Sequence, residues 1–386
     1  MLIEWAYLKR FKQRKVFWLI KLVLKGLEGL GNLGFQLGVF TGVFLMANNN
    51  IIAGKEVVLI SRPDGPPKES NFEIRETNIS EPGPGKVLVR SLYLSLDPYM
   101  RGRMSEGKSY AAPVKLGHVM GGGVVGEVLI SNSATFLPGD IVTGDLGWRT
   151  HSIASPHLLR KIDESHGPIS YNVSVLGMPG MTAYFGLLEV GKPKPGDTVF
   201  VSAASGAVGS LVGQIAKISG CRVIGTVSSE AKRAYCLNQL GFDEVINYKT
   251  CKDLNITLAS LCQDGIDINF ENVGGGISDI VMRHLAFKSR VVVCGMISEY
   301  NLKNPYIGPS CFRQVLINRA CIEGFLVTDW LNRWPEGIAR MAKWLEAGKI
   351  VFKEDIIDGL ESAPAGLIGL LEGRNFGKML VRIADR

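Results

Sequence analysis

The chain has 386 residues, of which 46% are hydrophobic and 20% charged, and this length exceeds one ordinary hydrophobic core, so two domains are expected. The formal net charge is +7, but residues 1–45 hold seven Lys or Arg against two Glu and supply +5 of it. The rest of the chain is therefore nearly neutral, which argues against a nucleic-acid partner.

The seven cysteines all lie at or after Cys221, and no two form a C-x-x-C pair. This odd and scattered set argues against a disulfide scaffold and against a structural zinc site. Because thiols stay reduced inside cells, we expect free cysteines in a cytoplasmic protein.

Residues 1–45 differ in pattern from the rest of the chain. A basic run, Lys9–Lys15, precedes an apolar stretch in which glycines recur every four residues, as they do in paired membrane helices. The most apolar part, Leu33–Met46, is shorter than the about 20 residues of a membrane span. Three interpretations stay open: an over-extended translation start, which we favour because a polar run begins at Met46; a membrane-associated segment; and an ordered extension.

From residue 46 to about 175, short apolar runs alternate with turns rich in Pro and Gly, which predicts a β-rich, barrel-like domain. The expected strands are Val57–Ile60, Lys86–Leu94, Gly123–Ile130 and Asp140–Thr143.

From residue 176 to about 344, strands alternate with helices, which predicts an α/β domain with a doubly wound parallel sheet. The expected strands are Thr198–Ala203, Arg222–Val227, Glu244–Asn247, Asp267–Asn272 and Arg290–Gly295. The expected helices are Pro179–Val190, Val208–Ser219 and Glu230–Leu240. Residues 345–386 return to short β segments, ending at Lys378–Ile383, and we expect them to fold back onto the first domain.

An A-x-x-G-x-x-G turn lies between the first strand and the next helix of this second domain. Small residues let backbone N–H groups and a helix N-terminus approach a pyrophosphate, so the turn predicts a dinucleotide site, against the alternative of a purely structural turn. The five residues concerned are Ser205, Gly206, Ala207, Val208 and Gly209.

The second strand of that domain ends in Thr226–Ser229, where an NAD-preferring site usually carries an acidic residue. Lys232 follows instead and suits a 2′-phosphate, so we expect NADPH as cofactor, although a solvated helix start would look similar. Gly117-His118-Val119 stands where a zinc alcohol dehydrogenase has Gly-His-Glu. The missing Glu and the lack of earlier Cys predict that no metal takes part.

Six segments make a family resemblance visible between about Val57 and Arg382. They are Leu92–Met104, Val175–Val190, Val199–Gly220, Glu271–Gly275, Cys294–Asn301 and Arg374–Lys378. In these segments the chain resembles the zinc-independent medium-chain dehydrogenase/reductases, in the branch of prostaglandin and alkenal double-bond reductases. The resemblance implies a GroES-like catalytic domain split around a Rossmann domain, and NADPH-dependent reduction of the carbon–carbon double bond in α,β-unsaturated aldehydes and ketones of the alkenal or curcumin type.

The same resemblance implies the site residues and a homodimer, joined through the strand near Ile322–Val327. The cofactor residues are the turn Ser205–Gly209 together with Lys232, Tyr248, Asn272, Cys294, Gly295, Phe325, Val327 and Asn375. Tyr99 and Tyr300 would face the substrate.

Tyr300 is our choice of proton donor or enolate stabiliser, because the hydride itself comes from the cofactor. The alternative is that Tyr300 only packs the nicotinamide pocket, and Tyr99 suits a pocket wall better than an acid. Arg101 and Arg103 are expected to hold the loop or a cofactor phosphate. Two other functions stay open: an NADPH–quinone oxidoreductase on the same fold, and an NADPH-sensing nucleic-acid-binding protein.

Overall fold

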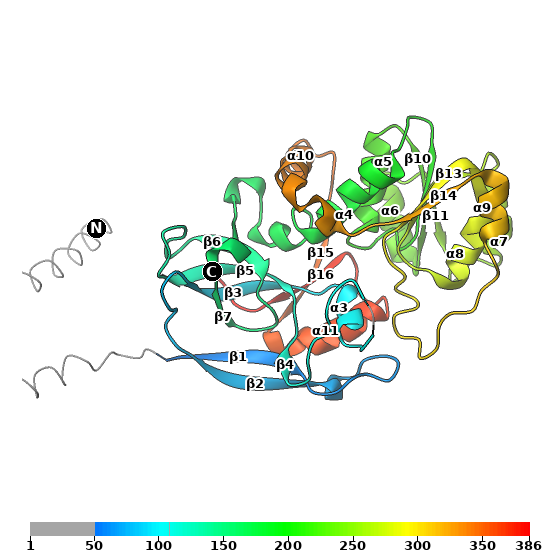
Figure 1. The fold of residues 1–386 in the computed structure, drawn as a ribbon. Coiled ribbons are helices and arrows are strands. Elements are labelled where there is room, and N and C mark those ends of the chain that lie inside the picture. The colour runs from blue at the N-terminus through cyan, green and yellow to red at the C-terminus, as the bar shows by residue number, and fades with distance from the viewer. Residues whose placement is uncertain (1–50, 108) are drawn as a thin grey trace, which may run out of the picture. The chain divides into compact units, whose positions relative to one another are not determined.

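The computed structural model describes residues 51–107 and 109–386, so every expectation about residues 1–45 lies outside the described residues. Figure 1 shows two groups of elements, one made mostly of strands and one in which strands alternate with helices. We call them the catalytic lobe and the cofactor lobe. In residues 51–386, Lys108 apart, no helix combines the length and the apolar composition that crossing a membrane takes.

The catalytic lobe contains two sheets. The smaller has the order β2-β1-β4, and the larger the order β15-β16-β3-β5-β6-β8, with β7 also paired to β3. The bounds are β1 Ile52–Leu59, β2 Phe72–Ile79, β3 Val87–Ser95, β4 His118–Val119, β5 Gly123–Ser131, β6 Ile141–Asp145, β7 His151–Ala154, β8 Arg160–Lys161, β15 Glu354–Asp358 and β16 Lys378–Arg382. Strand β3 lies at the centre, which explains why its side chains are buried on both faces.

The C-terminal strands belong to this first lobe. Strand β16 runs antiparallel to β3, with Leu380 opposite Ser95, and β15 pairs parallel to β16. Helix α11, Ala363–Leu371, packs its buried side on the same core, and the short helix α3, Tyr99–Arg103, follows β3 directly.

The cofactor lobe is a six-stranded parallel sheet of order β11-β10-β9-β12-β13-β14. Its strands are β9 Thr198–Val201, β10 Arg222–Val227, β11 Glu244–Asn247, β12 Ile266–Glu271, β13 Leu285–Val293 and β14 Cys321–Gly324. Its helices are α4 Met178–Phe185, α5 Gly209–Ile218, α6 Glu230–Asn238, α7 Leu254–Leu261, α8 Gly275–Val281, α9 Phe312–Asn318 and α10 Trp334–Glu346. This strand order is the Rossmann order, so the expected doubly wound sheet is confirmed.

Packing on the two faces of that sheet explains the order of helices. Side chains of α4, α5 and α10 pack with Val199 and Val201 in one core, and α7 and α8 cover Phe200 and Ile224 on the other face. Successive residues of β9 therefore enter different cores, as the alternation of a strand requires. Both faces are covered, so the three buried residues of the strand, Val199–Val201, are all apolar.

Two of the differences from the expected elements have a cause that the backbone shows. The helix expected at Pro179–Val190 ends as an α-helix at Phe185 and continues as a π-helical turn, Gly186–Gly191. A Cβ on Gly186 would collide with the ring of Phe325, so the bare backbone there admits that ring. Strand β13 begins at Leu285, not at Arg290, because it continues through an irregularity where Lys288 has φ +59°.

Candidate functional site

The turn Ser205–Gly209 lies at the carboxyl end of β9 and leads into α5. Ala203 adopts φ +51°, and a Cβ on Gly209 would collide with the carbonyl oxygen of Ala203, so only glycine fits there. Among the described residues, no acceptor meets the backbone N–H groups of Ala207, Val208 and Gly209. Three donors at a helix N-terminus suit an anionic group such as a pyrophosphate.

Strands β9 and β12 are neighbours in the sheet, and a polar network joins their carboxyl ends. The Asn272 side chain donates to the Ser202 carbonyl oxygen at 2.9 Å, and the Asn272 N–H donates to Ser202 Oγ at 2.8 Å. Ser202 Oγ in turn donates to Glu271 Oε1 at 2.8 Å. The network fixes predicted residue Asn272 at the point where the strand order reverses, which is where Rossmann sheets bind ligands.

Sequence reasoning missed Glu271, which is only 3% exposed. Its Oε1 also accepts the N–H groups of Val273 at 2.7 Å and Gly274 at 3.0 Å, so one carboxylate oxygen orders the whole turn after β12. Its Oε2 is buried and has no partner among the described residues. The available signal was an acidic residue at the end of a buried strand. A buried carboxylate needs several hydrogen-bond donors, so its position indicates an ordered polar network around it.

The turn after β13 carries Cys294, Gly295 and Tyr300. Cys294 N–H donates to the Glu271 carbonyl oxygen at 2.9 Å, which places this turn beside Asn272. The hydroxyl oxygen of Tyr300 accepts the Met296 N–H at 3.2 Å, so the phenol folds back over its own turn, against Gly295. Burial raises the pKa of Tyr300 and raises the pKa of Cys294 to about 12, so both keep their protons near neutral pH.

Lys232 lies on the first turn of α6, after β10. Its ammonium donates to the carbonyl oxygen of Gly373 at 2.8 Å and lies 3.5 Å from Ser228 Oγ. Burial lowers the pKa of Lys232, and the like charge of Lys249 lowers it further. Tyr248, 40% exposed, follows β11 at the same edge of the sheet. The predicted 2′-phosphate residues are therefore gathered in one place, where an anion would relieve the repulsion between two cations.

The three remaining predicted cofactor residues lie in different surroundings. The Phe325 ring packs edge-on to Phe270 with centroids 6.4 Å apart, and Val327 packs on the same core, so both side chains have structural roles. Asn375 is buried and donates to the Gly377 carbonyl oxygen at 2.8 Å, in the loop that also contacts Lys232 through Gly373.

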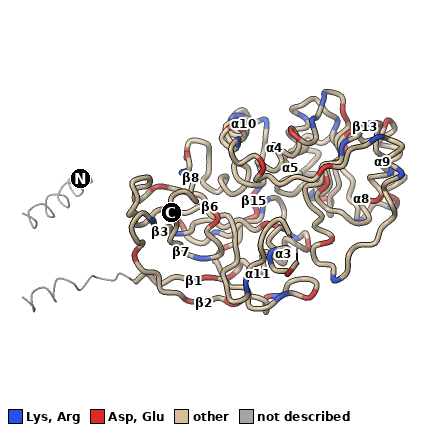
Figure 2. The backbone as a smooth tube through the Cα atoms, in the orientation of Figure 1, with Lys and Arg blue, Asp and Glu red and all other residues tan. Residues whose placement is uncertain are grey.

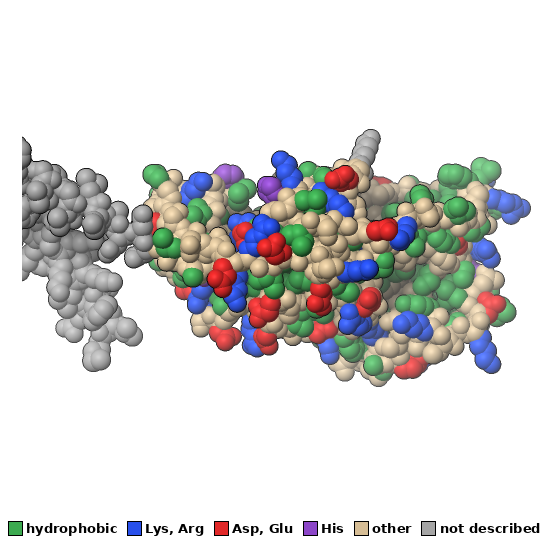
Figure 3. All heavy atoms as spheres, turned by 90° about the horizontal axis from the view of Figure 1, so that it is seen from below, with side chains coloured by type: hydrophobic (Ala, Val, Ile, Leu, Met, Phe, Trp, Pro, Cys, Tyr) green, Lys and Arg blue, Asp and Glu red, His purple; other side chains and the backbone are tan. Residues whose placement is uncertain are grey.

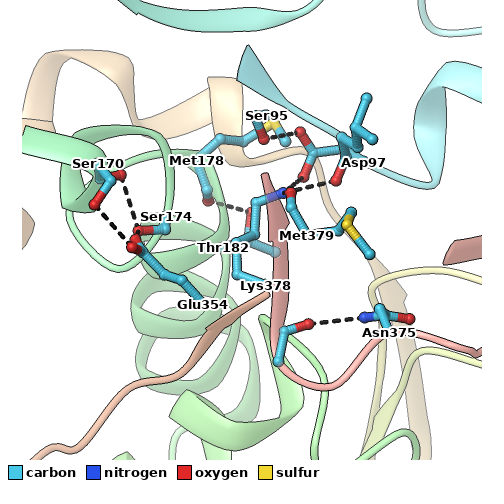
Figure 4. A network of polar contacts seen from close by, with 12 residues as sticks. Ser95, Asp97, Ser170, Ser174, Met178, Thr182, Glu354, Asn375, Lys378 and Met379 are labelled. Atoms are coloured by element: carbon cyan, nitrogen blue, oxygen red, sulfur yellow. Dashed lines mark hydrogen bonds and ion pairs between the residues drawn. The ribbon is translucent and has the colours of Figure 1, made fainter. Parts of the chain in front are cut away.

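Tyr99 opens helix α3, and the residue two positions before it anchors that helix. Asp97 forms a buried ion pair with Lys378 of β16, at 3.2 Å, and accepts a hydrogen bond from Ser95 (Figure 4). The Lys378 ammonium also donates to the carbonyl oxygens of Leu96 at 2.6 Å and Met379 at 2.8 Å. Burial lowers the pKa of Lys378, and the Asp97 charge opposes this. The pair therefore fastens the Tyr99 segment to the C-terminal strand.

One residue near Tyr300, Tyr110, was missed by the sequence analysis and has no sequence signal of its own. Tyr110, 63% exposed, has its pKa raised by the partial burial of its phenol and then by its neighbour Tyr300. The pKa of Tyr99 is raised by burial, then by Asp97, and the charge of Arg103 opposes the rise for both Tyr99 and Tyr110. Tyr110 is therefore within electrostatic range of Tyr300 and of Arg103, which belong to different lobes.

His118 is exposed, and its Nδ1 lies 3.2 Å from the Leu116 carbonyl oxygen. No group of three or more His, Cys, Asp or Glu with metal-binding geometry occurs in the part of the chain that the structure describes.

Comparisons with known proteins agree with this arrangement. Residues 55–162 match the family described as the N-terminal domain of oxidoreductase, and residues 207–343 match the family described as zinc-binding dehydrogenase. The chain is 44% identical to the NADPH-dependent curcumin reductase of Escherichia coli, over 85% of this chain and 96% of that protein. It is 45% identical to the NADP⁺-dependent 2-alkenal reductase of Nicotiana tabacum, over 86% of this chain and 98% of that protein.

Among solved structures, the CurA protein of Vibrio vulnificus in complex with NADPH superposes with a TM-score of 0.82 and 47% identity, covering 86% of this chain and all of that chain. These similarities extend over both lobes, so the chain belongs to the medium-chain dehydrogenase/reductase family, in the branch of prostaglandin, alkenal and curcumin reductases.

Proposed function

We propose that the protein is an NADPH-dependent reductase of the carbon–carbon double bond in α,β-unsaturated aldehydes and ketones. The observation that carries this proposal is a protonated phenol, Tyr300, at the carboxyl ends of the strands of the Rossmann sheet, where such sheets bind ligands. Its relatives act on such compounds by name, the curcumin reductase and the 2-alkenal reductase among them.

The residues present fit NADPH. The free N–H groups of the turn Ser205–Gly209 would hold the pyrophosphate, and Lys232 with Tyr248 would hold the 2′-phosphate. Asn272, Cys294 and Gly295 would border the nicotinamide, with the backbone of Phe325–Val327 and with Asn375 completing the site. When bound, this cofactor supplies the hydride that the β-carbon of the enone receives.

The chain's own contribution is made by Tyr300. Negative charge develops on the carbonyl oxygen of the substrate as the β-carbon is reduced, and a neutral hydroxyl stabilises it better than a carboxylate could. Tyr300 Oη already accepts the Met296 N–H, so its own hydrogen remains to be donated. One proton then completes the saturated α-carbon, and Tyr300 is the donor we propose for it. Tyr99 and Tyr110 would form walls of the pocket.

The test measures NADPH oxidation with an alkenal, an enone of the curcumin type and a naphthoquinone, and identifies the product. We expect saturated carbonyl products and faster turnover of the first two. Preference for the naphthoquinone would favour the quinone reductase function.

Tyr300→Phe tests the mechanism, since it keeps the ring and removes the hydroxyl, which is the proposed donor and the acceptor of the Met296 N–H. Turnover of a good enone should fall roughly a hundredfold, with the NADPH Michaelis constant unchanged. Tyr306→Phe is a matched control, because Tyr306 lies in the same loop as Tyr300 and its Oη donates to Asp279 of helix α8. Near wild-type turnover of Tyr300→Phe, with hydride transfer limiting the rate, would reduce Tyr300 to a pocket wall.

We also propose a homodimer joined along β14. All four residues of this edge strand, Cys321–Gly324, are exposed, and the neighbouring α9 exposes Phe312 and Leu316 by more than three quarters. On the face in Figure 3, hydrophobic side chains gather at the end where Figure 1 places α9. An open edge beside an apolar patch favours pairing with a second copy. Ile322→Glu should then produce monomers in sedimentation velocity.

The remaining proposals concern location, partners and domain division. All seven cysteines lie in the described residues as free thiols, which supports a cytoplasmic protein. Lys and Arg are interspersed with Asp and Glu over the described chain (Figure 2), and this mixed distribution argues against a nucleic-acid partner. We keep 46–175, 176–344 and 345–386 as the domain division.

A further inference from the structure

Arg101 is a buried cation whose hydrogen-bond partners are all neutral. It is 4% exposed, and its guanidinium donates from Nε to Asn301 Oδ1 at 3.1 Å, from Nη1 to Ser105 Oγ at 2.6 Å and from Nη2 to the Gly65 carbonyl oxygen at 2.8 Å. No carboxylate lies within ion-pair distance of it among the described residues. A buried charge without a counter-ion is costly, so these three bonds are what keeps it in place.

The three acceptors come from separate segments, two of which Arg62 also links, since its Nη1 donates to the Met104 carbonyl oxygen at 3.1 Å. Gly65 follows β1, Ser105 follows helix α3, and Asn301 lies 200 residues further along, in the turn after β13 of the cofactor lobe. Lys303 adds an exposed ion pair to Asp64, at 2.6 Å, between the same two segments. The planar fork of an arginine presents five donors in fixed directions, so Arg101 reaches acceptors on separate segments with a defined geometry.

The bond between Arg101 and Asn301 connects the segments that carry the two predicted substrate-facing tyrosines. Tyr99 lies two residues before Arg101 on the five-residue helix α3, and Tyr300 directly precedes Asn301. Helix α3 is itself fixed to β16 by the buried Asp97–Lys378 pair (Figure 4). A bond between Arg101 and Asn301 therefore fixes the turn that carries Tyr300 relative to the helix that carries Tyr99.

We infer that Arg101, acting through Asn301, is a positioning residue. It holds the Tyr300 hydroxyl in place at the carboxyl end of β13, where the proposed substrate would meet the nicotinamide. This inference rests on the proposed function of Tyr300. It assigns the loop-holding role to Arg101 and leaves the cofactor phosphates to the turn Ser205–Gly209 and to Lys232.

The test uses Asn301→Ala in the full chain, because this change removes the bond across the lobes and leaves the other two bonds of Arg101 intact. The matched control is Ser105→Ala, which removes one bond of the same guanidinium without affecting the Tyr300 turn. The first readout is hydrogen exchange of the peptide 294–303, whose Met296 N–H is bonded to Tyr300 Oη. We expect Asn301→Ala to accelerate that exchange about tenfold and Ser105→Ala to leave it near the wild-type rate.

The second readout is the factor by which Tyr300→Phe lowers enone turnover, measured in each background. We expect Tyr300→Phe to lower turnover roughly a hundredfold in the wild-type chain and in Ser105→Ala, but less than about tenfold in Asn301→Ala. In Asn301→Ala the hydroxyl is already misplaced and contributes little to turnover, so its removal has a smaller effect. NADPH affinity should be equal in all of them.

An unchanged exchange rate in Asn301→Ala, or an unchanged Tyr300→Phe factor, would overturn the inference. A melting temperature that falls while both readouts stay at wild-type values would assign Arg101 a purely structural role. If the wild-type chain reduces no enone at all, the proposed function fails by itself, and the exchange of peptide 294–303 alone then decides whether Arg101 holds the turn.

Discussion

Replacing Lys232 by Ala should weaken NADPH binding and leave NADH binding nearly unchanged. A charge-assisted hydrogen bond contributes about 1.5–3 kcal/mol. The ammonium is already held by the Gly373 carbonyl oxygen at 2.8 Å, so little side-chain entropy is lost when a phosphate binds. Repulsion from Lys249 also favours an anion there. The upper two thirds of the range, about 2–3 kcal/mol, corresponds to a loss of about 30- to 150-fold in affinity.

The assay is a fluorescence titration of the purified chain with each cofactor at one fixed salt concentration. NADH is the internal control because it lacks the 2′-phosphate, and Lys249→Ala, a second cation at the same edge, should cost less than about fivefold. The structure supplies a competing explanation, since Lys232 also joins the two lobes through Gly373. An equal loss with NADPH and NADH would therefore refute the phosphate role and leave only that interlobe contact.

Three further predictions concern stability and the first residues. Asp97→Asn should lower the free energy of unfolding by about 3–5 kcal/mol in urea titrations, because Lys378 keeps an uncompensated buried charge, and adding Lys378→Met should recover part of the loss. Burial raises the pKa of Tyr235 to about 12, above its usual value near 10, because the fold favours the protonated phenol. The contribution of Tyr235 to stability is therefore complete below pH 10 and should be lost as the pH rises towards 12. Urea unfolding at pH 9 and pH 11 measures this loss. A fragment that starts at Met46 should be soluble and as active as the full chain, and an inactive fragment beside an active full chain would contradict this.

Elements with both faces buried were the easiest to predict from sequence. The expected strands Arg222–Val227 and Glu244–Asn247 have the observed bounds, because apolar runs between turns have few alternative structures. Strand β2, Phe72–Ile79, was not predicted, since most of its side chains are exposed or half-exposed and only Phe72 is buried. The strand forms because β2 pairs with β1, and the residues of β2 alone do not indicate that pairing.

The candidate site divides in the same way. The cofactor turn could be predicted because its function depends on a bare backbone, and small residues between a strand and a helix reveal this directly. The contacts of Lys378 and Arg101, and the bond of Glu271 to Ser202, could not be predicted, because each depends on a partner distant in the chain. Lys378 donates to the carbonyl oxygen of Leu96, 282 residues away, and no local spacing encodes such a bond.

The two ends of the site are joined across the lobes by contacts of the same kind. At one end Lys232 donates to the Gly373 carbonyl oxygen, and at the other Arg101 donates to Asn301 Oδ1. Each contact joins a cation to a neutral acceptor and is worth about 1.5–3 kcal/mol. Lys232 is also the proposed 2′-phosphate ligand, and because an ammonium has three donors, it can bind a phosphate while it still donates to Gly373. Asn301 is no proposed ligand, so the contact beside Tyr300 is independent of the cofactor. Both interlobe contacts would therefore be kept when NADPH binds, and the proposed proton donor would not be displaced.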